Sequence, residues 1–249
     1  MKKELGIVVL LSVFLLSGCG SDKQEPVTQN SSEPASQQVT SQSEENSSGA
    51  LIEATKDEKV KLYANKEMDK VIEGVTLDVN GSKKDFDWKI PDSGTKPQLF
   101  YTDLTSDGKE EAVVIIQTGK GTGLDNFEIH VINADDLSEI KVQSYEDIVA
   151  NHIESHVAKK DDGIAVTVIT QGKELKFENK SAIAAPDQKE LAFGGVVTYT
   201  LENQTIKLNI PGSVGVSPIF VCDFNVSYKY DSAKNEFIVD QIEAKPIKE

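Results

Sequence analysis

The chain has 249 residues, with 41 acidic side chains against 26 basic ones and a formal net charge of −15 at pH 7. Every basic residue is a lysine, because the sequence contains no arginine. Proteins that recognise nucleic acid neutralise phosphates and read bases with the arginine fork, so this composition argues against nucleic acid as a partner. The same reasoning disfavours phosphorylated ligands and anionic wall polymers.

The N-terminus has the features of a secretion signal. Lys2 and Lys3 precede an apolar run over Leu5–Leu16, and small residues follow the run. A basic region, an apolar region and a small-residue site in this order are typical of a secretory signal. The run of about a dozen residues falls short of the roughly 20 that span a bilayer as a helix.

The signal ends on Leu16-Ser17-Gly18-Cys19, which resembles the lipobox of bacterial lipoproteins. The resemblance implies that residues 1–18 are a signal peptide and that Cys19 receives a diacylglyceryl group and becomes the mature N-terminus. It also implies a lipid-anchored location at the extracytoplasmic face of the cell membrane, with the bilayer as a partner. An ordinary cleaved signal or a weak membrane anchor is the alternative left open.

Residues 19–50 are predicted to form a disordered tether behind the lipidated cysteine. From Gly20 to Ala50 the sequence is rich in Ser, Gln, Glu and Thr, with two prolines and almost no apolar residues. Such a segment cannot bury enough surface to offset the entropy lost on ordering. About 30 flexible residues reach on the order of 30 Å, which would let a domain stand clear of the head groups.

Residues 51–249 are predicted to form a β-rich extracytoplasmic domain. Short runs with partial apolar–polar alternation are separated by turn residues, a pattern that indicates strands. Asn80-Gly81-Ser82 predicts a hairpin turn, and Trp88 is expected to anchor a core or a sheet edge. The expected strands are 60–63, 71–79, 86–90, 98–102, 112–117, 127–132, 140–142, 164–169, 174–177, 196–201, 205–210, 219–230 and 236–242.

One helix is predicted over 144–157. Ser144 can act as the N-cap, with Asp147 at the capping-box position. Apolar residues fall on one helical stripe, namely Tyr145, Ile148, Val149, Ile153 and Val157. The predicted fold class is therefore mainly β (α+β), with antiparallel sheets in meander connections and one packed helix. A subdivision of the domain near 143–160 is left open.

The segment from Asp103 to Glu111 carries the clearest chemical pattern. It has oxygen side chains at positions 1, 3 and 5, a glycine at position 6 and a carboxylate further on, which suits a hard cation. An EF-hand would need a bidentate Glu at position 12, where Val114 stands, and its flanks would be helices.

Residues 97–142 resemble a single calcium hairpin blade of the FG-GAP/VCBS type found in integrin-like propellers. The resemblance implies calcium as a cofactor, and its ligands would be Asp103, Thr105, Asp107, the Lys109 carbonyl and Glu111. The sequence departs from the family at Thr105, where Asp or Asn is usual, and at Glu111, where Asp is more frequent. Three carboxylates remain, which predicts weak affinity. The alternative left open is a plain hairpin turn whose metal site has decayed.

Three other patterns have a structural and a functional interpretation. His152 and His156 lie four apart on the predicted helix and could share a metal, but no Glu stands at the metalloprotease position, and surface histidines are the other interpretation. The glycines of 119–123 lie between two predicted strands, which indicates a flexible connection rather than a phosphate loop. Cys222, within an apolar run, is predicted to be a buried small hydrophobe.

No catalytic residue is predicted. The sequence has three histidines and no Gly-x-Ser-x-Gly elbow, and His130 has no catalytic arrangement of carboxylate or serine near it in the sequence. The predicted function is non-catalytic binding, assembly or sensing at the cell surface. Two alternatives stay open: a hydrolase that acts on wall material through a carboxylate pair, and a solute-binding lipoprotein of a transporter.

Overall fold

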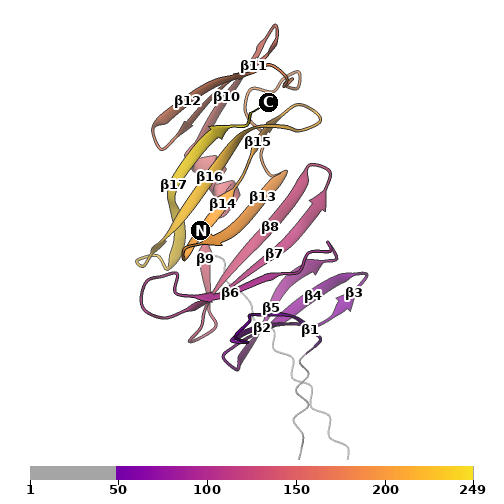
Figure 1. Ribbon diagram of the computed structural model, residues 1–249, viewed down its shortest axis with the longest axis vertical. Coiled ribbons are helices and arrows are strands. Elements are labelled where there is room, and N and C mark those ends of the chain that lie inside the picture. Colours follow the sequence, from indigo (N-terminus) through magenta and orange to yellow (C-terminus); the bar gives the residue numbers. More distant parts are fainter. Residues whose placement is uncertain (1–48, 249) are drawn as a thin grey trace, which may run out of the picture. The chain divides into compact units, whose positions relative to one another are not determined.

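The computed structural model describes residues 49–248, which Figure 1 shows coloured along the sequence. Strands dominate this range and a single helix interrupts them, which confirms the predicted mainly β class. The signal peptide, Cys19 and almost all of the predicted tether lie outside the described residues. The elements are β1 (Leu51–Ala54), β2 (Val60–Ala64), β3 (Glu67–Met68), β4 (Val71–Val79), β5 (Ser82–Pro91), β6 (Gln98–Thr102), β7 (Glu111–Gly121), β8 (Leu124–Asn133), β9 (Glu139–Val142), α1 (Tyr145–His152), β10 (Ile153–Lys160), β11 (Gly163–Thr170), β12 (Lys173–Asn179), β13 (Val196–Glu202), β14 (Thr205–Asn209), β15 (Gly212–Val214), β16 (Ile219–Asp231) and β17 (Glu236–Pro246).

The described strands form three sheets (Figure 1). Strands β1–β5 make a five-stranded sheet, and β10–β12 make a three-stranded one. The remaining strands make a nine-stranded sheet in the order β13-β14-β16-β17-β9-β8-β7-β6, with β15 attached to β16. Because β13 also pairs with β8, the strands β8, β9, β17, β16, β14 and β13 form a closed circuit.

The predicted meander over 98–142 is confirmed. Strands β6, β7, β8 and β9 each pair antiparallel with the next. The two contacts that complete the closed circuit are parallel and short, and the sequence did not predict them. Glu236 and Phe237 of β17 pair with β9, and Val196 and Val197 of β13 pair with β8.

Strand β7 is buried on both faces. Its residues Ala112–Ile116 are each at most 1% exposed. Val113 and Ile115 belong to the larger core, which also contains residues of the closed circuit, α1, β10 and β11, with residues of β12 packed against it. Ala112, Val114 and Ile116 belong to the smaller core, which they share with the sheet of β1–β5. Successive side chains of a strand point to opposite faces, so a strand between two cores must be apolar at every position.

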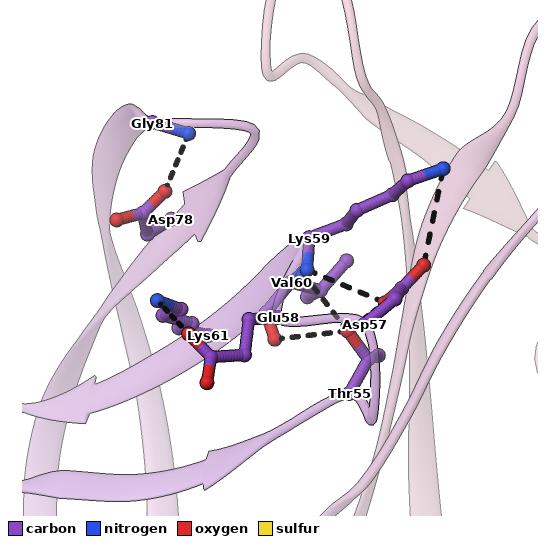
Figure 2. A network of polar contacts seen from close by, with 8 residues as sticks. All are labelled: Thr55, Asp57, Glu58, Lys59, Val60, Lys61, Asp78 and Gly81. Atoms are coloured by element: carbon purple, nitrogen blue, oxygen red, sulfur yellow. Dashed lines mark hydrogen bonds and ion pairs between the residues drawn. The ribbon is translucent and has the colours of Figure 1, made fainter.

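The predicted hairpin at Asn80-Gly81-Ser82 is confirmed, since β4 ends at Val79 and β5 begins at Ser82. Asn80 and Gly81 have φ angles of 52° and 90°, the left-handed conformation that a two-residue hairpin turn requires. The Asp78 carboxylate fixes this turn by accepting a hydrogen bond from the Gly81 N–H at 2.8 Å (Figure 2).

A second turn joins β1 to β2 through side-chain contacts. The Thr55 hydroxyl donates to the Asp57 carboxylate at 2.7 Å and accepts from the Val60 N–H at 3.1 Å (Figure 2). Glu58, with a φ of 57°, forms an ion pair with Lys61 at 2.9 Å. The hydrogen bond from Thr55 lowers the pKa of Asp57 from its ordinary value, so the carboxylate stays charged and keeps the turn closed.

The glycine-containing segment forms part of a hairpin. Gly119, Lys120 and Gly121 belong to β7 and pair with β8, and only Thr122 and Gly123 make the turn. The flexible connection predicted for 119–123 is therefore wrong in extent. The strands β1, β3, β10 and β15 were not predicted.

The predicted helix is correct at its start and wrong at its end. The Ser144 hydroxyl caps α1 by accepting from the Asp147 N–H at 3.1 Å, as predicted. The helix ends at His152, however, and Ile153 begins β10, which pairs along its whole length with β11. Residues four apart, such as Ile153 and Val157, lie on one side of a helix but also on one face of a strand, so the pattern fits both. Among residues 49–248, no helix has the length and apolar character needed to cross a membrane.

The double burial of β7 gives a first prediction. Ile115→Ala and Ile116→Ala remove buried methyl groups from opposite faces, and each is expected to lower the free energy of unfolding by about 2–5 kcal/mol. Both variants should still unfold in one transition in a denaturant titration, because β7 belongs to both cores. Ile183→Ala, at a side chain that is 76% exposed, is the control and should change stability by less than about 0.5 kcal/mol. Two separate transitions in either core variant would contradict this account.

Candidate functional site

A cleft opens along one edge of β8. This edge pairs with β13 at Asp125 and Asn126 and with β9 at Val131 and Ile132. Between these points, residues 127–130 have a partner strand among the described residues only on the opposite edge, where β7 lies. Strands β9 and β13 diverge from β8 here and leave a cleft of about 700 Å³. This volume falls within the range of about 300–1,000 Å³ that is usual for ligand sites.

The cleft has an apolar lining and a polar rim. Ser144, Tyr145 and Glu146, at the start of α1, form one part of the rim. The apolar side chains that line it all belong to the larger core or pack against it: Phe127, Ile129, Ile140, Val142, Val197 and Tyr199. A ligand in the cleft would therefore contact the apolar interior on one side and the polar rim on the other.

Two buried tyrosines support the inner side of the cleft. Burial raises the pKa of Tyr199 to about 12, and burial also raises the pKa of Tyr228 beside it. The Tyr228 hydroxyl donates a hydrogen bond to the Gln143 carbonyl at 2.9 Å. Both phenols therefore keep their protons at neutral pH, and that of Tyr228 acts as a hydrogen-bond donor.

His130 is held between carboxylates and aromatic rings. Its Nδ1 lies 2.7 Å from a carboxylate oxygen of Glu139, and its Nε2 lies 4.0 Å from Glu128. The imidazole stacks on Trp88 with ring centroids 4.0 Å apart, and Trp88 stacks on Phe86 at 4.2 Å. Of the two roles expected for Trp88, an anchor of a core or of a sheet edge, the structure shows the first, because Trp88 packs against the smaller core.

The pairing of His130 with Glu139 was not predicted. The two residues lie nine apart in the sequence and meet only because β8 and β9 pair in antiparallel register. Glu128, two residues before His130 on the same face of the strand, gives no indication of the contact with Glu139.

The rim of the cleft is acidic. Glu128 and Glu139 have side chains that are 65% and 43% exposed, and Glu146 is also exposed. The cation on the rim, Lys141, forms an ion pair with Glu236 at 2.9 Å. Its charge is therefore matched within the protein, and the three glutamates leave the rim negative.

Two buried polar atoms on residues that line the cleft have no hydrogen-bond partner within the described structure. These are Oδ1 of Asn126 and Nε2 of His130. The Asn126 amide nitrogen donates to the Gly194 carbonyl at 3.0 Å, which fixes the orientation of this side chain. Buried polar atoms are ordinarily paired, so a polar group of a ligand in the cleft could bond to these two atoms.

Glutamine side chains cover the backbone groups along one edge of β17, whereas residues 127–130 of β8 have no such cover within the described part of the chain. The Gln143 side chain accepts from the Val239 N–H at 3.1 Å. The Gln171 side chain accepts from the Ile242 N–H at 3.0 Å and donates to the Asp240 carbonyl at 2.9 Å. A larger groove of about 980 Å³ lies beside Gln171, and it is lined in part by β12, whose one partner strand among the described residues is β11. The cleft on β8 is preferred here because it lies between two short pairings of a single strand edge and has an apolar lining.

The predicted calcium hairpin is held together by its own backbone. Both oxygens of Asp103 accept hydrogen bonds, from the Ser106 N–H at 2.7 Å and from the Gly108 N–H at 3.0 Å. The Asp107 carboxylate accepts from the Lys109 N–H at 2.9 Å. Oxygens that the resemblance assigns to calcium therefore also bond to N–H groups of the loop.

Glu111 points into the protein. It is 2% exposed, and its carboxylate accepts from the Leu104 N–H at 2.7 Å and from the Thr105 N–H at 3.3 Å. Burial raises the pKa of this carboxyl above its ordinary value, although these hydrogen bonds act in the opposite direction. The Lys109 side chain forms an ion pair with Asp135. Within residues 49–248, no group of three or more His, Cys, Asp or Glu side chains is placed to hold a metal ion, and calcium binding stays a prediction.

The structure places the two histidines on different elements and buries Cys222. His152 is the last residue of α1 and His156 lies on β10, so the helical face that they were predicted to share does not exist. Cys222 is a free, fully buried cysteine, as predicted, and burial raises its pKa to about 12. This thiol stays protonated and packs as a small apolar group.

Comparisons of the chain with protein-family models, with curated proteins and with solved structures gave no match. The resemblances to the lipobox and to the calcium hairpin therefore stay predictions from the sequence.

If the hairpin binds calcium, millimolar calcium should raise the melting temperature of the wild type but not of Asp107→Ala. Calcium at ten times its Kd would stabilise the folded state by about 1.4 kcal/mol, which corresponds to roughly 3–6 °C for a domain of this size. Asp162→Ala, in the turn between β10 and β11, is the control and should respond like the wild type. Equal shifts in wild type and Asp107→Ala would rule out this site.

The buried Glu111 should make stability depend on pH. Its native pKa lies above the ordinary value of 4.5, so between these two values the native state binds more protons than the unfolded state. The free energy of unfolding of the wild type, relative to Glu111→Gln, should therefore fall as pH rises from 4.5 through the raised pKa, and level off above it. Denaturant titrations of both proteins at several pH values measure this difference. A difference that is constant or that rises with pH would contradict the assignment.

Proposed function

We propose that this protein is a bacterial lipoprotein that acts as a non-catalytic binding or assembly protein at the extracytoplasmic face of the cell membrane. In this proposal Cys19 carries the lipid, residues 19–50 form the tether, and the β-rich domain presents the cleft on β8 to a partner. The proposal is supported by the lipobox-like Leu16-Ser17-Gly18-Cys19 and by the composition of the following segment.

The observation that carries the binding role is the open stretch of β8. An unpaired strand edge is usually covered or charged, because it offers N–H and C=O groups to other chains. Here residues 127–130 border a cleft with an apolar lining, while the adjacent edge of β17 is covered by glutamine side chains. Because the edge of β8 is accessible and the edge of β17 is covered, β8 is suited to bind another chain.

A wall hydrolase is the second candidate, favoured by the closeness of Glu128, Glu139 and His130. General acid–base catalysis needs a carboxylate whose environment tunes its proton affinity. Both carboxylates lie on the rim and are about half exposed or more, which favours electrostatic recognition over proton transfer. A solute-binding lipoprotein usually has βαβ repeats, whereas the described residues contain one helix, of eight residues.

The lipid anchor can be tested with the two cysteines of the chain. Cys19→Ser is expected to leave the membrane fraction or to accumulate as an unprocessed precursor, because no thiol remains to take the diacylglyceryl group. Cys222→Ala removes the other, buried thiol and should stay with the membranes. Cell fractionation followed by mass spectrometry of the N-terminus gives both readouts. Normal processing and membrane retention of Cys19→Ser would refute lipidation at this residue.

A further inference from the structure

We propose that the cleft on β8 binds an extended segment of a partner protein in which apolar and basic residues alternate, and that this segment adds as a strand along residues 127–130. This inference rests on the proposed binding role and assigns that role a ligand class.

The register of β8 determines which backbone groups face the cleft. On this edge the Asn133 N–H donates to the Ser138 carbonyl, and the Asp125 N–H donates to the Gly195 carbonyl, both at 2.9 Å. In a strand the hydrogen-bonding groups of alternate residues point to the same edge. The odd-numbered residues of β8 therefore face β9 and β13, and the N–H and C=O of Ile129 face the cleft.

The ladder between β8 and β9 ends at Val131, two positions before Ile129. Val131 pairs with Ile140, and continued antiparallel register would bring Ile129 opposite Val142. The two strands have diverged at that point, and the cleft lies between them. An inserted strand could bond to Ile129 as β9 bonds to Val131, which is the mode of recognition by strand addition.

The side chains around this stretch separate into two faces. Phe127 and Ile129 pack on the larger core, together with Val142 and Tyr199 on the facing strands. The residues between them along β8, including Glu128, point to the opposite face. An inserted strand would therefore place one set of side chains against apolar groups and the alternate set beside carboxylates.

The charge around the cleft selects the partner. Glu128 and Glu139 lie on the face opposite the larger core, Glu146 lies at the start of α1, and Lys141 is already paired with Glu236 at 2.9 Å. Lysine or arginine at the outward positions of the segment would complement this charge and would exclude acidic partners. A second copy of this chain, with a net charge of −15 and no arginine, fits this rim poorly.

The test uses the full-length protein in detergent and a labelled, end-capped peptide of the sequence Lys-Val-Lys-Val-Lys-Val-Lys. Fluorescence anisotropy measures binding, and hydrogen exchange with mass spectrometry locates it. We expect saturable binding and slower exchange, by about tenfold or more, in fragments that cover 127–130. Glu128→Lys should raise the Kd by about tenfold or more, whereas Glu178→Lys, at an exposed carboxylate of β12, should leave it unchanged.

Three control peptides distinguish the ways in which the proposal can fail. The same peptide with alternate backbone N-methyl groups cannot pair along its edge and should not bind. Equal binding of the methylated form would overturn strand addition in favour of charge attraction alone. The other two control peptides carry Thr or Glu in place of every Lys. If either of them protects residues 127–130 and the Lys-Val peptide does not, the proposed basic partner is wrong, although the cleft would still bind an extended segment.

Two further outcomes would also overturn the proposal. If no peptide slows exchange at residues 127–130 at millimolar concentration, the cleft is not a strand-binding site. The lipid anchor is tested separately, by fractionation of Cys19→Ser. If protection of 127–130 rises with protein concentration in the absence of peptide, the edge binds a second copy of the chain.

Discussion

The burial of β7 on both faces is the constraint on which the rest of the domain depends. Ala112–Ile116 are apolar at successive positions, so alternation requires a layer on each side of the strand. The sheet of β1–β5 covers one face, and the larger core with α1 and β10–β12 covers the other. A strand packed in this way cannot shift by one residue without moving its side chains into the wrong core. Strand β8, which pairs with β7 along nearly its whole length, is therefore fixed along one edge.

This fixed edge explains how the opposite edge of β8 can be divided between two partners. Two residues pair with β13 at one end and two with β9 at the other, and the stretch between them keeps its extended form because β7 holds it. On β17, by contrast, the side chains of Gln143 and Gln171 cover the strand edge. The contrast between a covered and an open edge within one sheet links the packing of β7 to the proposed binding role.

The sequence predicts elements whose signals are local and misses those that depend on distant pairing. The apolar run of Ala112–Ile116 predicts a buried strand, but a run alone does not say that two different cores cover it. The extent of α1 was overestimated because Ile153 and Val157 suit a helix and a strand equally, and only the ladder with β11 decides between them. The contact of His130 with Glu139, and the short parallel contacts that complete the closed circuit, depend on register set by segments far apart in the chain. The lipid anchor and the calcium hairpin are predictions from motifs and await the experiments above.

Amide hydrogen exchange of the free protein, resolved by residue, tests most directly whether β8 is held on one edge and open on the other. The account predicts that the amides of Ala112–Ile116 that lie in ladders exchange only through global unfolding, and that Val131 is similarly protected. The amide of Ile129, in the same strand, should exchange orders of magnitude faster, because the divergence of β9 leaves it without a strand partner. Protection of Ile129 equal to that of Val131 would show that the edge is closed, and the proposed binding site would lose its basis.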